Sequence, residues 1–139
     1  MDAGLSRSAT RTFWGRHIGG ARLVAVCDTV QSRADAIASK FGVPAIYDMD
    51  DFLARKDVDA VAVLTPSGMH AAHVIAWAKA GKHAIVEKPM ALRLQDADDM
   101  IRACDEAGVK LFVVKQNRFN VPLVIPCLIL RPAGWPFRA

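Results

Sequence analysis

The chain has 139 residues, of which 53% are hydrophobic and 23% are charged, with 9 glycines and 7 prolines. This length allows one domain with its own core but not two ordinary ones, and the composition excludes a disordered, collagen-like or disulfide-stapled protein. The formal net charge of +4 comes from 18 basic and 14 acidic residues without a basic run, so we expect no nucleic-acid partner.

The two ends of the chain, its longest apolar run and its cysteines indicate the cellular compartment of the protein. The first 20 residues contain no apolar stretch of the kind found in a secretory signal. Residues 121–130 form the longest apolar run, which is about half of the roughly 20 residues that a membrane helix needs. The cysteines are widely spaced, as buried thiols in a reducing compartment are: Cys27, Cys104 and Cys127. We therefore expect a cytoplasmic protein with no membrane partner.

Three segments of the chain carry apolar residues at the i, i+3, i+4, i+7 spacing that places them on one face of a helix. These positions are Ala34, Ile37, Ala38 and Phe41, then Ala71, Val74, Ile75 and Ala78, then Ala97, Met100, Ile101 and Cys104. Each segment is followed by a glycine able to end a helix: Gly42, Gly81 and Gly108. The spacing predicts three amphipathic helices.

Short apolar runs without polar alternation lie between these helices, which is typical of strands that are covered on both faces. They occupy residues 23–27, 60–64, 84–86 and 111–114, and residues 45–47 form a weaker, edge-like candidate. Strands that alternate with helices predict right-handed βαβ units. We therefore expect an α/β fold with a doubly wound parallel sheet of the Rossmann-like type.

In such a sheet, ligands bind beyond the carboxyl ends of the strands, and polar residues follow each predicted strand. Asp28 follows the first one, where an acid can bind the adenosine ribose of a dinucleotide or can be a capping or loop aspartate. Thr65, Pro66 and Ser67 follow the 60–64 strand. Hydroxyl and N–H groups at that point can hold an anion or a ribose, and Ser67 can also serve as the N-cap of the next helix.

The histidines and large aromatic residues near this edge have less specific positions. His70 and His73 have i, i+3 spacing, but no third ligand lies at a recognisable spacing, so we expect no metal site. We expect His70, at the mouth of the site, to contact a ligand, and we expect His73 and His83 to be structural. Trp77 and Phe112 are expected in the core rather than against a cofactor.

Glu87, Lys88 and Pro89 end the 84–86 strand at the same edge. A lysine there can bond to a sugar hydroxyl and take part in proton transfer, or it can be a solvated side chain in a turn stiffened by the proline. Farther along, Arg118 offers donors suited to phosphate or carboxylate, or it is a surface arginine after a strand.

Together these segments resemble the Gfo/Idh/MocA oxidoreductases, the family of glucose–fructose oxidoreductase and inositol dehydrogenase. The resemblance rests on the runs LVAVCD, DMDDFLARKDVDAVAVLTPS and TPSGMHAAHVIAWAKAGKHAIVEKPMAL, of which the EKP element is specific to the family. A further run, ACDEAGVKLFVVKQNRFN, resembles the branch that oxidises UDP-N-acetylglucosamine-type nucleotide sugars, especially the 3-dehydrogenases of UDP-N-acetylglucosamine and its uronic acid. The resemblance covers residues 21–122.

The resemblance implies hydride transfer from a sugar carbon to NAD, giving a keto-sugar. Lys88 would meet the reacting hydroxyl as the catalytic residue, Pro89, often cis in this family, would fix its turn, and Asn117 and Arg118 would also bind the substrate. From position and resemblance together, the residues expected to bind the cofactor are Asp28, Thr65, Pro66, Ser67, His70, Glu87, Lys88 and Gln116. The charge of Asp28 favours NAD over NADP because it repels a 2′-phosphate.

Both ends of the chain depart from the family pattern. Residues 1–20 contain neither the first strand nor the glycine-rich turn, so we interpret them as a non-family leader and expect weakened cofactor binding. Residues 21–120 then form a partial dinucleotide-binding domain. Residues 121–139 form an irregular apolar tail in place of the family's C-terminal domain, which supplies the oligomer interface.

We hypothesise a truncated or frameshifted, impaired enzyme. The alternatives are a non-catalytic nucleotide-binding or regulatory module and an inactive remnant.

Overall fold

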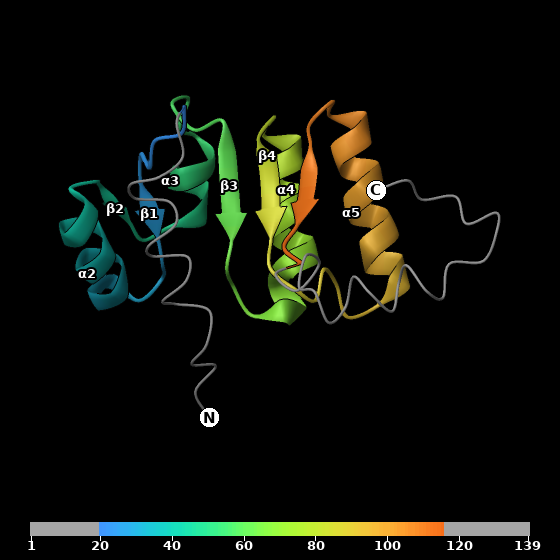
Figure 1. Ribbon diagram of the computed structural model, residues 1–139, viewed down its shortest axis with the longest axis horizontal. Helices are drawn as coiled ribbons and strands as arrows, with labels where there is room; N and C mark the ends of the chain where they lie inside the picture. Colours follow the sequence, from blue (N-terminus) through green and yellow to red (C-terminus); the bar gives the residue numbers. More distant parts are fainter. Residues whose placement is uncertain (1–19, 116–139) are drawn as a thin grey trace, which may run out of the picture. The chain divides into compact units, whose positions relative to one another are not determined.

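The computed structural model describes residues 20–115, which divide after Asp59 into two compact units. The first unit contains two parallel strands and two helices (Figure 1). Its elements are β1 (Val26–Cys27), α2 (Gln31–Phe41), β2 (Ala45–Ile46) and α3 (Met49–Leu53). The weak, edge-like strand candidate is therefore confirmed as β2, the parallel neighbour of β1.

The second unit contains a three-stranded parallel sheet in the order β3-β4-β5, with a helix in each connection (Figure 1). Its elements are β3 (Ala60–Val63), the 3₁₀ turn η1 (Ser67–Met69), α4 (His70–Lys79), β4 (His83–Val86), α5 (Leu94–Glu106) and β5 (Leu111–Val113). Within the register, Val63 lies opposite Val86, and Val86 lies opposite Val113. The predicted Rossmann-like α/β class with parallel strands is confirmed.

The three predicted amphipathic helices are present and end at the predicted glycines. Gly108 has a φ of 67° and follows α5. The N–H of Val109, the next residue, donates to the carbonyl of Cys104 at 3.0 Å, which closes the helix end with a buried apolar residue. A residue with a side chain would be strained at that φ, which is why a glycine position marks the helix end in the sequence.

Two short elements do not follow from apolar periodicity. Helix α3 begins after Asp48, whose carboxylate accepts hydrogen bonds from the N–H groups of Asp50 at 2.7 Å and Asp51 at 3.3 Å. The other is η1, which places Ser67 inside a 3₁₀ turn. Ser67 makes no capping hydrogen bond, and the N-cap position of α4 is Met69, so the prediction of Ser67 as the N-cap is wrong.

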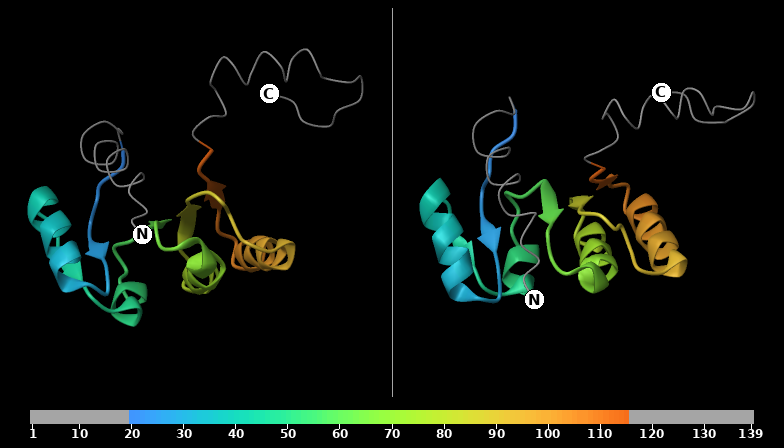
Figure 2. Two further views of the ribbon diagram at one scale, coloured as in Figure 1. Left: turned by 90° about the horizontal axis from the view of Figure 1, so that it is seen from below. Right: turned by 60° about the horizontal axis from the view of Figure 1, so that its bottom comes forward.

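Helices α4 and α5 lie on the same face of the β3-β4-β5 sheet (Figure 2). Successive right-handed crossovers that advance in one direction along a sheet must place their helices on one face. The core lies between these helices and the sheet, and its most buried members are Val74, Ala78, Ala84, Val86 and Met100. Within residues 20–115, no helix has both the length and the apolar character needed to cross a bilayer.

Exposure along the strands shows which sheet face the helices cover. Strand β3 alternates between exposed Ala60 and Ala62 and buried Val61, although all its side chains are apolar. Trp77 is 2% exposed, so its predicted place in the core is confirmed. Phe112 is 56% exposed, and its predicted place in the core is wrong, because apolar character does not decide which face of a strand is covered.

We expect Met100→Ala to lower the free energy of unfolding of the second unit by about 2–5 kcal/mol, because the side chain is fully buried on α5 and its removal leaves a cavity. Urea unfolding followed by circular dichroism measures the change. The neighbouring Ile101→Ala is the matched control, since Ile101 is 47% exposed and should cost about 1 kcal/mol or less. Equal losses for the two variants would contradict the assigned helix face.

Candidate functional site

Two of the predicted ligand-facing segments meet at the carboxyl edge of the β3-β4-β5 sheet. Thr65–Ser67 follows β3 and Glu87–Pro89 follows β4. The ladder carries on to this edge, since the N–H of Glu87 donates to the carbonyl of Val63 at 3.3 Å. Because parallel strands end together, residues about 20 positions apart in the sequence share one edge of the sheet.

The side chain of His70 joins these two segments. Its Nε2 lies 2.9 Å from the carbonyl oxygen of Thr65, and its Nδ1 lies 2.9 Å from the carbonyl oxygen of Pro89. The ring is 1% exposed. We expected His70 to contact a ligand, but both ring nitrogens are engaged with backbone carbonyls. The contribution of His70 in this structure is to hold the two segments, and its place beside the cofactor stays a prediction.

The other two histidines of the unit also make internal contacts, as expected. His73 Nδ1 lies 3.0 Å from Thr65 Oγ1, and burial, aided by the charge of nearby His70, lowers the pKa of His73. His83 Nδ1 accepts a hydrogen bond from the N–H of Lys110 at 3.0 Å. In the part of the chain that the structure describes, no three side chains are grouped so that they could hold a metal ion.

The turn after β4 carries an acid and a lysine at consecutive positions, Glu87 and Lys88. The Lys88–Pro89 peptide is cis, in agreement with the form expected from the resemblance. The carboxylate of Glu87 accepts a hydrogen bond from the N–H of Lys88 at 3.2 Å. Glu87 is half-buried, whereas Lys88 is exposed and so is open to a partner outside the chain. This pair can bind hydroxyl groups through both an acceptor and a donor.

Asp28 lies in the first unit, at the carboxyl end of β1. Its N–H donates to the carbonyl of Ile46 at 3.2 Å, and its Oδ1 accepts a hydrogen bond from the N–H of Val30 at 2.8 Å. This is the local turn of a loop aspartate, and the N-cap of α2 is Val30 itself. Among residues 20–115, the second carboxylate oxygen has no hydrogen-bond partner, so it can accept one from a ligand.

The charge of Asp28 affects the pKa of the neighbouring Cys27 thiol. Burial raises the pKa of the Cys27 thiol, and the charges of Asp28 and Asp48 raise it further. Both carboxylates therefore act on the carboxyl end of the β1-β2 pair.

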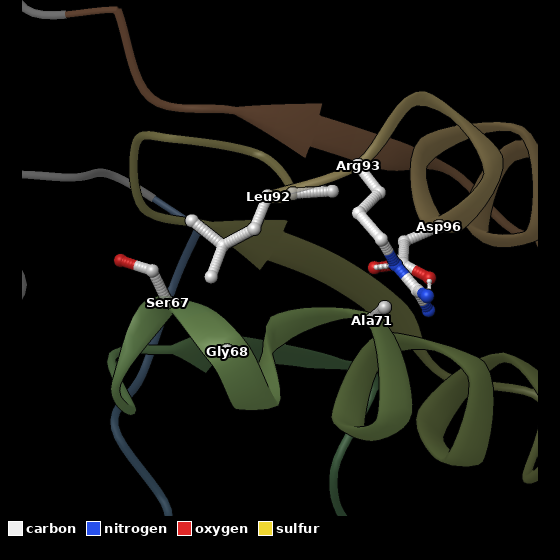
Figure 3. A pocket seen from close by; sticks show the side chains of 7 residues that line it. Ser67, Gly68, Ala71, Leu92, Arg93 and Asp96 are labelled. Carbon is white, nitrogen blue, oxygen red and sulfur yellow. Dashed lines mark hydrogen bonds and ion pairs between the residues drawn. The ribbon is translucent and has the colours of Figure 1, made fainter.

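A pocket of about 380 Å³ lies between the start of α4 and the segment that leads into α5 (Figure 3). Its lining residues are Ser67, Gly68, Ala71, Ala91, Leu92, Arg93 and Asp96. The Arg93 guanidinium donates to Asp96 Oδ2 at 3.1 Å and Oδ1 at 2.7 Å, which lowers the pKa of Asp96. Of the predicted site residues between 20 and 115, only Ser67 lines this pocket. Arg93 and Asp96 were not singled out from the sequence, although their i, i+3 spacing could have indicated the pair.

Three predicted site residues, Gln116, Asn117 and Arg118, lie outside the described residues. Their roles at the cofactor and the substrate stay predictions.

The sequence matches the profile of a family described as an oxidoreductase family with an NAD-binding Rossmann fold, over residues 3–115. The matched range begins inside the segment 1–20 that we expected to be a non-family leader, and it includes every described strand and helix.

Solved structures and characterised relatives agree with this match. The WlbA dehydrogenase from Bordetella pertussis, solved with NADH and UDP-GlcNAcA, is 44% identical with a TM-score of 0.73, over 78% of this chain and 32% of that one. The UDP-N-acetylglucosamine 3-dehydrogenase GnnA from Acidithiobacillus ferrooxidans is 32% identical with a TM-score of 0.63, over 67% and 30%. The D-apiose dehydrogenase of Paraburkholderia graminis is 39% identical over 88% and 33%. The chain thus spans about a third of the length of these relatives.

We expect Asp28→Asn to increase the alkylation rate of Cys27 by up to about five-fold at a fixed pH near 8, because one unit charge at close range in water is worth about 1 kcal/mol. The variant keeps the oxygen that accepts from the N–H of Val30 and removes only the charge. Site-resolved mass spectrometry after iodoacetamide treatment measures the rate. Cys104 is the internal control, since burial and the charge of Asp105 raise its pKa. An unchanged Cys27 rate would contradict the electrostatic contact.

Proposed function

The chain belongs to the Gfo/Idh/MocA family of NAD-binding oxidoreductases, and on this premise we propose that it supplies the cofactor side of a dehydrogenase for UDP-N-acetylglucosamine-type nucleotide sugars. The observation that carries the proposal is the shared carboxyl edge, where His70 joins the segment Thr65–Ser67 to the turn Glu87–Pro89. The choice of substrate class is supported by WlbA, which was solved with UDP-GlcNAcA, and by GnnA. D-apiose dehydrogenase shows that other sugars are used by relatives of similar identity.

The residues on these edges suit the two riboses of NAD. The second carboxylate oxygen of Asp28 would accept hydrogen bonds from the adenosine ribose hydroxyls. Glu87 would accept from the nicotinamide ribose, and the segment Thr65–Ser67, with His70 behind it, would border that half of the cofactor. We propose NAD rather than NADP, because the negative charges of Asp28 and Asp48 act on the same strand ends.

In the proposed reaction, bound NAD supplies the acceptor for a hydride that leaves a sugar carbon. Lys88 Nζ would hold the hydroxyl on that carbon and, as a neutral amine, would take its proton while the C–O bond becomes a carbonyl. Gln116 would lie near the nicotinamide, and Asn117 and Arg118 would bind the nucleotide sugar. The products are a keto-sugar, a reduced cofactor and a proton on Lys88.

We expect saturable binding of NADH to the full chain, seen as a change in cofactor fluorescence, with NADPH binding at least about ten-fold more weakly. Asp28→Ala should weaken NADH binding by about ten-fold, equivalent to about 1.4 kcal/mol, because the ribose loses its charged acceptor. Asp59→Ala is the matched control, an exposed acid of the same unit outside the proposed site. Absence of saturable NADH binding, or equal affinity for NADPH, would refute the proposed cofactor.

We expect UDP-N-acetylglucosamine or its uronic acid to alter the NADH signal of the wild-type chain, and Lys88→Ala to abolish that change because the hydroxyl loses its partner. Lys79→Ala is the control, because Lys79 is exposed at the far end of α4. Formation of NADH from NAD and either sugar, followed by absorbance, tests for turnover. Cofactor binding without response to either sugar would favour a non-catalytic nucleotide-binding module.

A further inference from the structure

The two histidines of α4 engage the same residue of the neighbouring loop. His70 Nε2 bonds to the carbonyl oxygen of Thr65, and His73 Nδ1 bonds to its hydroxyl oxygen. Their i, i+3 spacing brings both rings to one side of the first helical turn. The two histidines, whose i, i+3 spacing is also compatible with metal ligands, therefore hold the loop after β3.

His70 alone reaches a second segment, the turn that carries Lys88. Its Nδ1 bonds to the carbonyl oxygen of Pro89, 19 residues away in the sequence. Beyond the ladder contact of Glu87 with Val63, no other hydrogen bond in the described part of the chain joins the segment 64–69 to the segment 87–93. His70 is therefore a side-chain link between these two ligand-facing segments, in addition to the strand pairing that brings them to one edge.

The number of protons on the ring follows from the chemistry of its partners. A carbonyl oxygen can only accept a hydrogen bond, and a neutral imidazole has one N–H to donate. Both contacts of His70 are 2.9 Å long, so both are hydrogen bonds only when both ring nitrogens carry a proton. The neutral ring would keep one bond and turn a nitrogen lone pair towards the other carbonyl.

We propose that His70 is a positioning residue that, doubly protonated, locks the loop Thr65–Ser67 to the turn Glu87–Pro89, and that loss of one proton releases one of the two segments. The consequence for catalysis rests on the function proposed above, in which these segments hold the cofactor and the reacting hydroxyl. The protonation and the mechanical link do not depend on that function.

Other charged groups around the first turn of α4 bear on this proton. They are His73 on α4, Glu87 and Lys88 after β4, and Arg93 and Asp96 at the start of α5. Arg93 and Asp96 are paired with each other. Burial and the charge of His70 lower the pKa of His73.

Nitrogen-15 NMR of the full chain, without cofactor, tests the proposal directly. We expect the His70 ring to show two protonated nitrogens at about pH 6. As the pH is raised, the backbone amide signals of Ser67 and Lys88 should shift with the same midpoint as the His70 ring. A His70 ring with a single proton at about pH 6, or amide signals that do not follow its titration on both segments, would overturn the proposal.

The variant His70→Gln adds a second measurement, because glutamine can donate to one carbonyl but cannot bridge as an imidazolium does. We expect the shared midpoint of the two amide signals to disappear in this variant and to persist in the matched control His73→Gln. If His70→Gln does not fold, the wild-type titration alone decides the matter. A wild-type chain that shows the coupled titration but binds no NADH would refute the proposed function and leave this inference standing.

Discussion

Parallel pairing of β3, β4 and β5 is the constraint on which the second unit depends. It requires a crossover after each strand, and these crossovers are α4 and α5, both on one face of the sheet. It also brings the carboxyl ends of neighbouring strands together, so that the residues after β3 and the residues after β4 share one edge. The core and the candidate site are thus two consequences of one hydrogen-bonding pattern.

The buried side chain of His70 connects this strand pairing to the candidate site. His70 begins α4, and its ring lies within reach of carbonyls at the ends of two adjacent strands. Leaving either carbonyl without a donor inside the protein would carry the cost of an unsatisfied polar group. The same ring therefore contacts backbone carbonyls of both segments at this edge.

Much of this architecture could be predicted because it follows from local periodicity. The spacing of apolar residues predicted α2, α4 and α5, and glycine positions predicted where they end. Helix α3 has five residues, too few for a periodic signal, and only the acidic cap Asp48 marks its start. For Phe112 the strand was predicted correctly but the exposure of the side chain was not. A strand has two faces, and which face is covered depends on helices that are distant in the sequence.

The sequence by itself determined the α/β class, the order of the strands and of the three amphipathic helices, and the polar residues at the strand ends that resemble a nucleotide-binding family. Tertiary structure alone decided that His70 contacts the carbonyls of Thr65 and Pro89, that His73 bonds to the Thr65 hydroxyl, and that Arg93 and Asp96 border a pocket. The physical reason is the distance along the chain over which each interaction acts. Local spacing sets which face of an element is apolar, whereas a hydrogen bond between segments depends on strand register and helix crossovers, which no short stretch of sequence contains.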